Sequence, residues 1–250
     1  MRRKYQTIYL TDDPIIIYEE ILSGTYSKFP PRFIDKDNIK KIMRYVFLTQ
    51  KKYGREQICS LTRRDLHKLH MSSFFKEISC FYTIVSMSFP EMNIKEWELK
   101  SVPNDFWKKA ENRKRYFLSI CKEYEFDIES KKDLLEITSD IIESHHGKKA
   151  IKEAGGVYEL IKESTDTPYL EWEICKIPKW NDKLTYDAVK WLVEDKLKLD
   201  PDLIKNSSNS EVLKLIRRTD VLNYSLKGLL KSRFKGYVLD MIRFVYPVKQ

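Results

Sequence analysis

The chain has 250 residues, of which 42% are hydrophobic, which is enough apolar material for a core and too much for disorder throughout. Only 7 glycines and 9 prolines are present, which excludes collagen-like and low-complexity proteins, and no run of about 18 apolar residues predicts a membrane span. The net charge of +9 favours an acidic partner such as nucleic acid.

The two ends of the chain are basic, while residues 101–200 carry more acidic than basic side chains. The basic start, Met1–Gln6, is not followed by an apolar block before Asp12, so no secretory signal is predicted and we expect a cytoplasmic protein. The 4 cysteines lie far apart without a C-x-x-C pair, so they predict reduced thiols and neither a disulfide framework nor a zinc ribbon.

The first predicted helix covers residues 14–22. Asp13 is placed to act as its N-cap, Pro14 as its first residue and Gly24 as the glycine that follows its end. We expect residues 1–27 to form an N-terminal capping segment.

A longer helix is predicted over residues 37–53, with Gly54 as its C-terminal cap. Its apolar residues have the spacing i, i+3, i+4, i+7 and i+8, which forms a one-sided stripe; they are Ile39, Ile42, Met43, Val46 and Phe47. Similar stripes predict helices over about 108–124 and 183–197.

A shorter helix is expected after each long one. The first of these shorter helices is indicated by Thr62 and Asp65, which have capping-box spacing, and the second by Thr138, which is a natural N-cap. Residues 210–213 lie at the corresponding place after the third long helix. A further helix is predicted in each unit, over residues 73–87, 156–163 and 226–244. The helix of the middle unit is the shortest, which suggests that this unit has lost its last turn or a final short helix. No alternating run predicts a strand, so the expected fold is all-α.

Proline spacing indicates internal repetition. Pro30, Pro103 and Pro178 are about 75 residues apart, which predicts three tandem degenerate helical repeats stacked in one array, over residues 28–95, 96–170 and 171–250. Tryptophans flank these prolines and are interpreted as a rigid joint that packs one repeat on the next; they are Trp97, Trp107, Trp172 and Trp180. Stacking on unpaired bases is the alternative, which the neighbouring acids disfavour; these are Glu96, Glu98, Glu171 and Glu173.

Four motifs follow one another in the chain, which are Glu-Trp-Glu, Val-Pro-x-x-Phe-Trp, Gly-Gly and a terminal aromatic-Pro. In the order of these motifs, the chain resembles a helical repeat that is found beside homing endonucleases. Similar repeats occur in proteins of Bacillus-type bacteria and their phages. The matching residues are Trp97, Pro103, Phe106, Trp107, Gly155, Gly156, Phe89, Pro90, Tyr246 and Pro247. The resemblance covers roughly residues 24–250 and implies a DNA-binding accessory role. The first unit departs from it, with Ser72-Ser73 in place of Gly-Gly, and the chain carries no nuclease module.

Residues for catalysis are sparse. The chain has 4 histidines and no nucleotide-binding glycine loop or nucleophile elbow, so we expect no enzyme, no catalytic residue and no cofactor. His67 and His70 could bind zinc with Cys59 and Cys80, but their spacing matches no common zinc pattern, so no metal is expected.

Basic clusters are the remaining candidates for function. The expected nucleic-acid-binding residues are Arg63, Arg64, Lys68, Lys148, Lys149, Arg217, Arg218, Lys227, Lys231, Arg233 and Lys235. Lys227, Lys231 and Lys235 recur every four residues and would line one flank of the helix predicted over 226–244. Arg217, Arg218 and Arg233 are the expected readers of guanine edges. A merely solvated basic surface is the alternative for each cluster, including the one at residues 113–115.

The sequence therefore favours a non-enzymatic protein that binds duplex DNA through basic clusters on short helices, a regulator of transcription from a phage or mobile element. The acidic middle of the chain leaves a second hypothesis open, a protein-interaction module in which an inhibitor or adaptor uses the groove of the array. A nuclease accessory whose catalytic partner is another chain is a third. No membrane partner is expected.

Overall fold

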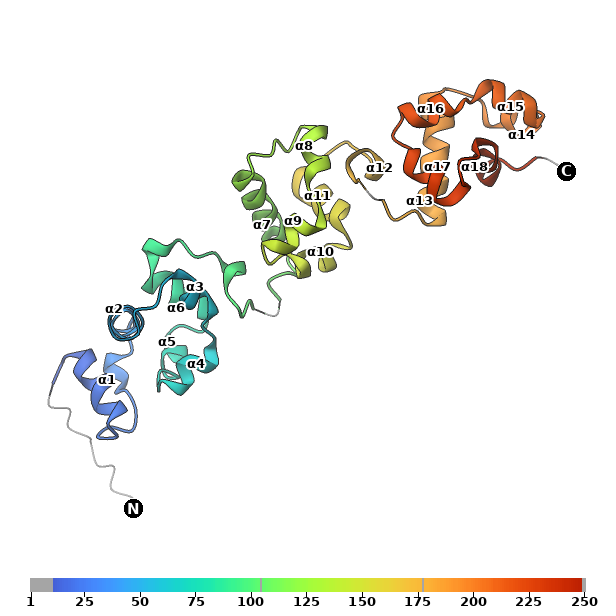
Figure 1. Ribbon diagram of the computed structural model, residues 1–250. Coiled ribbons are helices and arrows are strands. Elements are labelled where there is room, and N and C mark those ends of the chain that lie inside the picture. The colour runs from blue at the N-terminus through green and yellow to red at the C-terminus, as the bar shows by residue number, and fades with distance from the viewer. Residues whose placement is uncertain (1–10, 104, 177, 249–250) are drawn as a thin grey trace, which may run out of the picture. The chain divides into compact units, whose positions relative to one another are not determined.

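The computed structural model describes residues 11–103, 105–176 and 178–248, and within these it is all-α, with 65% helix and no strand (Figure 1). The chain divides into two compact units, Met1–Phe106 and Trp107–Gln250. The described residues do not include the first ten residues of the predicted capping segment, which contain the basic start at residues 1–6, nor Asn104 and Ile177. No described helix is long and apolar enough to cross a bilayer.

The first helix of unit 1, α1 (Pro14–Leu22), confirms the prediction from its end signals. The Asp13 side chain accepts a hydrogen bond from the Ile15 amide, at 2.9 Å, and Pro14 occupies the first helical turn. Gly24 follows the helix with φ +84°, a left-handed conformation that glycine adopts readily.

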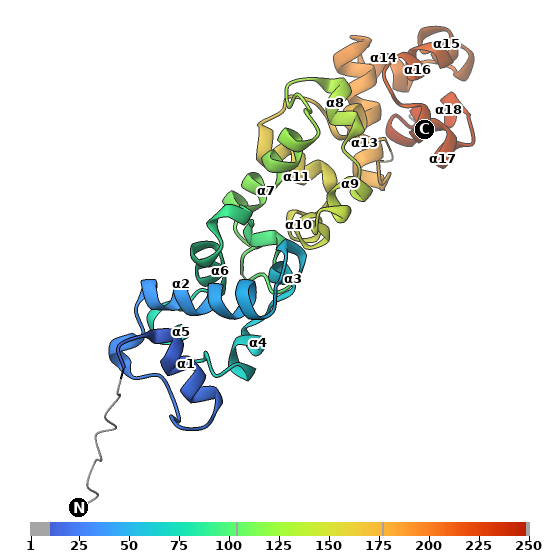
Figure 2. The same cartoon turned by 60° about the vertical axis from the view of Figure 1, so that its left-hand side comes forward.

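The long helix of unit 1 starts as α2 (Lys36–Arg44) and continues as a π-helical segment, η2 (Tyr45–Gln50). Figure 2 shows this helix from the side. Its predicted apolar stripe is fully buried and packs against α1 and α6. The predicted cap was wrong, because Lys52 is the left-handed residue behind the helix, at φ +53°, whereas Gly54 precedes α3 in an extended conformation.

Short helices complete unit 1. They are α3 (Arg55–Ser60), α4 (Arg63–Lys68), α5 (Phe74–Glu77), α6 (Phe81–Ser88) and the 3-10 turns η1 (Pro31–Phe33), η3 (Pro90–Met92) and η4 (Glu96–Glu98). The capping box predicted at the start of α4 is present, with the Thr62 amide donating to Asp65 Oδ2 at 2.9 Å. The single helix predicted over 73–87 was wrong, because the chain is extended at Ile78 and divides into α5 and α6.

Unit 2 begins with another long helix, α7 (Ala110–Glu123), close to its predicted range. It is followed by α8 (Lys131–Glu136), α9 (Ser139–Ser144), α10 (Lys148–Ala154), α11 (Val157–Thr165) and α12 (Glu171–Ile174). Thr138 caps α9 as predicted. The predicted loss of a final helix here was wrong, since α10 and α11 are both full-sized and α11 packs along α7.

The rest of unit 2 is again a long helix followed by short helices. It consists of α13 (Asp182–Lys190) with its π-helical end η5 (Trp191–Lys196), then α14 (Pro201–Asn206), α15 (Asn209–Leu215), α16 (Arg218–Asn223), α17 (Lys227–Phe234) and α18 (Val238–Val245). The helix predicted over 226–244 was wrong. Lys235 and Gly236 both have positive φ, +50° and +92°, and divide it into α17 and α18.

Trp97, Trp107 and Trp172 are buried. Trp180 is half-buried, and its ring stacks on that of Trp172 with centroids 6.4 Å apart. The acids beside two of these rings also have structural partners. Glu98 accepts from the Lys95 amide and pairs with Arg55, and Glu173 accepts from the Leu170 amide and pairs with Lys131.

Candidate nucleic-acid interface

Two short helices joined by a tight turn carry the basic residues of the middle of the chain. α9 ends at Ser144, residues 145–147 form the turn, and α10 starts at Lys148. His146 has φ +67°, and the Gly147 amide closes the turn by donating to the Ile142 carbonyl at 2.9 Å. A three-residue turn between two helices has the length found in a helix-turn-helix.

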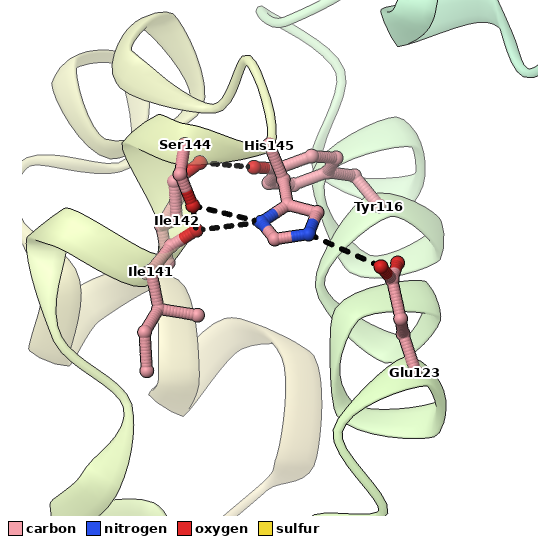
Figure 3. A network of polar contacts seen from close by, with 6 residues as sticks. All are labelled: Tyr116, Glu123, Ile141, Ile142, Ser144 and His145. Atoms are coloured by element: carbon pink, nitrogen blue, oxygen red, sulfur yellow. Dashed lines mark hydrogen bonds and ion pairs between the residues drawn. The ribbon is translucent and has the colours of Figure 1, made fainter.

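Side chains of α7 hold this turn in place (Figure 3). Tyr116 Oη donates to the Ile142 carbonyl at 2.6 Å, and burial raises the pKa of this phenol, which keeps it protonated as the donor. His145 Nε2 lies 3.2 Å from Glu123 Oε1, and its Nδ1 lies 2.9 Å from the Ile141 carbonyl oxygen. The end of α9 and the turn are therefore attached to α7 by one buried hydrogen bond, from Tyr116, and by one exposed contact, between His145 and Glu123.

The same turn geometry occurs after α4 and α16. His70 and Ser225 have φ +59° and +66°, and the next amides donate back to the carbonyls of Leu66 and Val221, at 2.9 Å and 3.1 Å. Between α16 and α17 the turn again has three residues, 224–226, while five residues separate α4 from α5. The same hydrogen bond from the amide behind a positive-φ residue also ends α7 at Glu125 and α10 at Gly155, so this is a common helix end in the described residues.

Most of the predicted binding residues lie on these helix pairs with exposed side chains. Lys148 and Lys149 begin α10, and Lys227 begins α17, where Lys231 lies one turn further on. In unit 1, Arg64 and Lys68 are exposed on α4, as is Arg63, whose guanidinium lies 4.1 Å from the Phe75 ring centroid. The structure thus brings lysines to the second helix of each pair in unit 2, and arginines and a lysine to the first helix of the pair in unit 1.

The predicted stripe of Lys227, Lys231 and Lys235 was wrong in its third member. Lys235 lies behind the end of α17 in the left-handed conformation, and the Gly236 amide donates to the Leu230 carbonyl at 2.9 Å. The stripe therefore has two lysines, because the helix stops before a third turn can present the next one. Arg218 lies beside this break, with its guanidinium about 3.8 Å from the position that a Cβ on Gly236 would take.

The arginines expected to contact guanine edges differ in the exposure and the hydrogen-bond partners of their side chains. Arg217 and Arg218 are exposed at the start of α16. Arg233 is half-buried instead, where it donates to Thr185 Oγ1 at 2.8 Å and to Asp182 Oδ1 at 2.6 Å. These bonds tie α17 to α13, so Arg233 holds the two helices together and is not a free contact residue.

Two further arginines of the basic clusters also hold the fold together. Arg113 is buried and donates to both carboxylate oxygens of Glu163, at 2.6 Å each, and to the Trp107 carbonyl at 2.7 Å. Arg243 donates to the carbonyls of Ile204 and Ser207. Their role could not be inferred from the sequence, because their partners are 34 to 50 residues away or are backbone oxygens.

A basic cavity in unit 1 contains residues that the sequence did not single out. Its volume is about 450 Å³, and Lys51 and Lys100 line it together with Lys68. The three lysines come from separate segments, so neither spacing nor periodicity could have identified the group.

Residues considered for zinc do not come together. Among the described residues, no group of three or more His, Cys, Asp or Glu side chains is placed to hold a metal ion. His67 stacks on Phe75, with ring centroids 6.0 Å apart.

A comparison of the chain with protein-family models, with curated proteins and with solved structures finds no match. The function of the basic residues must therefore be inferred from their chemistry and their place on the helix pairs. Arginine and lysine side chains exposed on the helices of a helix-turn-helix are the groups with which such pairs contact phosphates and base edges.

Proposed function

We propose that this is a non-enzymatic protein that binds duplex DNA, built from three copies of one helical unit that each present a helix pair to the nucleic acid. The observation that carries the proposal is that α4, α9 and α16 each end in this turn and are each followed by another short helix, with exposed lysines or arginines on the helices. DNA-binding proteins place the second helix of such a pair in the major groove.

Matching buried positions support the proposed copies. The first helix of each copy buries five residues at the same spacing of i, i+3, i+4, i+7 and i+8. These are Ile39, Ile42, Met43, Val46 and Phe47 in the first copy, Arg113, Tyr116, Phe117, Ile120 and Cys121 in the second, and Thr185, Ala188, Val189, Leu192 and Val193 in the third. In all three proposed copies the first helix therefore packs on the core through positions of the same spacing, which is the spacing of a helix with one buried face.

The end of this first helix supports the copies further. A residue with φ between +53° and +55° follows the helix in each, namely Lys52, Glu125 and Lys198. Between the last buried residue of the helix and this positive-φ residue, the first and third copies have one more residue than the second. In both of these copies the last turn of the helix is π-helical, as it is not in the second. A π-helical turn accommodates one extra residue, so this length difference leaves the framework unchanged.

Charge supports DNA as the partner. Among the described residues, no carboxylate lies within ion-pair distance of the exposed lysines of α10 and α17, and their ammonium groups would release counterions on binding a phosphate backbone. The resemblance to repeats that accompany homing endonucleases points the same way. A cytoplasmic regulator of transcription encoded by a phage or mobile element is the role we infer.

A gel-shift titration at two salt concentrations tests the proposal. The variant K148Q/K149Q/K227Q/K231Q removes four candidate contacts, so the log–log salt slope should flatten by about three to four units. The matched control, K122Q/K132Q/K183Q/K214Q, changes four exposed lysines of unit 2 that lie on other helices. Absence of binding at low salt, or an equal loss in the control, would contradict the proposal.

A cavity in unit 2 favours a second candidate function, a protein-interaction module. The cavity has a volume of about 850 Å³ and is lined by apolar side chains, by four acids and by three lysines; the charged residues are Glu143, Glu159, Glu171, Asp187, Lys162, Lys179 and Lys183. Burial and the nearby Glu159 raise the pKa of Glu171, and the buried Trp172 indole nitrogen has no hydrogen-bond partner. A protein that fails to bind DNA, but loses a co-purifying partner when Glu159 and Glu171 are changed to Gln, would support this candidate over DNA binding.

A further inference from the structure

The basic cavity of unit 1 lies between the end of the long helix and the first helix of the helix pair. Phe47, Lys51 and Tyr53 line it on one side, and Asp65, Lys68 and Leu69 of α4 and its end on the other. Lys51 Nζ lies 6.0 Å from the centroid of the Tyr53 ring, a cation–π contact that limits where this side chain can point. The Lys100 amide donates to the Cys59 carbonyl at 2.9 Å, which fixes the third segment against α3.

The positive charge in this cavity is not balanced. Three lysines and one carboxylate, that of Asp65, line the cavity, and Asp65 already accepts hydrogen bonds from the Thr62 amide and hydroxyl at 2.9 Å and 2.6 Å. These bonds, followed by the fields of Lys68 and Lys100, lower the pKa of Asp65, which shows that both lysines lie near the same carboxylate. The nearby acid Glu98 is paired with Arg55.

The three lysines are not needed to build the fold. In the second and third proposed copies, the position of Lys51 is occupied by Tyr124 and Leu197. The position of Lys68 is occupied by Ser144 and Asn223. Cys175 takes the place of Lys100 in the second copy. Because the other copies form the same helices without these lysines, the group in unit 1 calls for a reason other than folding.

We propose that this cavity binds a phosphate group. Three ammonium groups around a concave site of this volume are suited to a phosphate or diphosphate, which they neutralise and to which they can donate several hydrogen bonds. The phosphate could belong to the DNA backbone, since the first helix of a helix-turn-helix crosses the backbone, or to a free phosphorylated compound. The backbone source rests on the proposed DNA-binding function, whereas the free source does not.

The test uses the full chain, the pocket variant K51Q/K100Q and a charge-matched control, K36Q/K41Q, which alters exposed lysines of α2 outside the cavity. Binding of inorganic pyrophosphate and of ATP is measured by calorimetry, and binding of duplex DNA is measured by gel shift at two salt concentrations. Neither Lys51 nor Lys100 belongs to the DNA-contact set tested above, so the two experiments are independent.

Binding of pyrophosphate or ATP that weakens at least about tenfold in the pocket variant, but not in the control, would assign a free phosphate compound to the cavity. If neither compound binds, a DNA salt slope that flattens by about one unit in the pocket variant alone would assign a backbone phosphate. Unchanged binding of all three probes, or equal losses in both variants, would overturn the proposal. Pyrophosphate binding without DNA binding would keep the cavity assignment and refute the proposed DNA-binding function.

Discussion

Gly147 should be the least replaceable glycine of the helix pairs. A Cβ at this position would lie 2.0 Å from Tyr116 Oη and 2.5 Å from Ile142 Cγ2, both far inside van der Waals contact. Its φ of −89° is open to any residue, so backbone strain is not involved. Overpacking costs about 1–3 kcal/mol, and displacing Tyr116 from the Ile142 carbonyl costs about 1 kcal/mol more. We expect Gly147→Ala to lower the free energy of unfolding of unit 2 by about 2–4 kcal/mol.

Gly228 supplies the matched control. It lies in the first turn of α17, and a Cβ there would meet Trp180 Nε1 at 3.6 Å, an ordinary contact. Gly228→Ala should therefore stabilise unit 2, by up to about 1 kcal/mol, because alanine favours the helix. Urea unfolding followed by circular dichroism measures both variants. Equal stability of Gly147→Ala and wild type, or a shift of the same sign in both variants, would refute the packing described for this turn.

Two further predictions concern buried ionisable groups. Arg113→Met should lower the free energy of unfolding, measured in urea, by about 3 kcal/mol, because it leaves the Glu163 charge without its partner. The double variant R113I/E163M should recover most of this loss. Equal stability of the two variants would contradict the structural role of the pair. Burial raises the pKa of Cys121 to about 11 and that of Cys175 to about 12, so folding favours the protonated thiols. Stability should be complete below about pH 8.5, where the unfolded thiols are protonated, and should fall on the order of 1 kcal/mol for each thiol by pH 10. The variants C121A and C175A should show a smaller fall in urea midpoint between pH 8 and pH 10, and an unchanged fall would refute this cause.

Helices with a one-sided apolar stripe could be predicted from the sequence. The ranges expected around Ile39, Tyr116 and Ala188 agree with α2 and η2, with α7, and with α13 and η5 to within a few residues. The stripe determines these helices because burial of one face is their main source of stability. End signals were equally informative where a side chain makes the cap, as at Asp13 and Thr62.

Breaks that depend on a left-handed residue other than glycine could not be predicted. Lys52 and Lys235 end their helices with positive φ, a conformation that lysine adopts only where the surroundings impose it. The same limit affected the site. Exposed lysines on the short helices were visible in the sequence, but the internal roles of Arg113 and Arg233 depend on partners distant in sequence.

The wide final turns at Tyr45–Gln50 and Trp191–Lys196 permit a residue to be added to a helix while its buried face and the chain reversal behind it stay as they are. A residue added or lost within this wide turn changes which side chains the turn presents to solvent, while the residues on either side keep their buried positions. Surfaces of related chains would accordingly diversify at this turn first, by differences in length as well as by substitution.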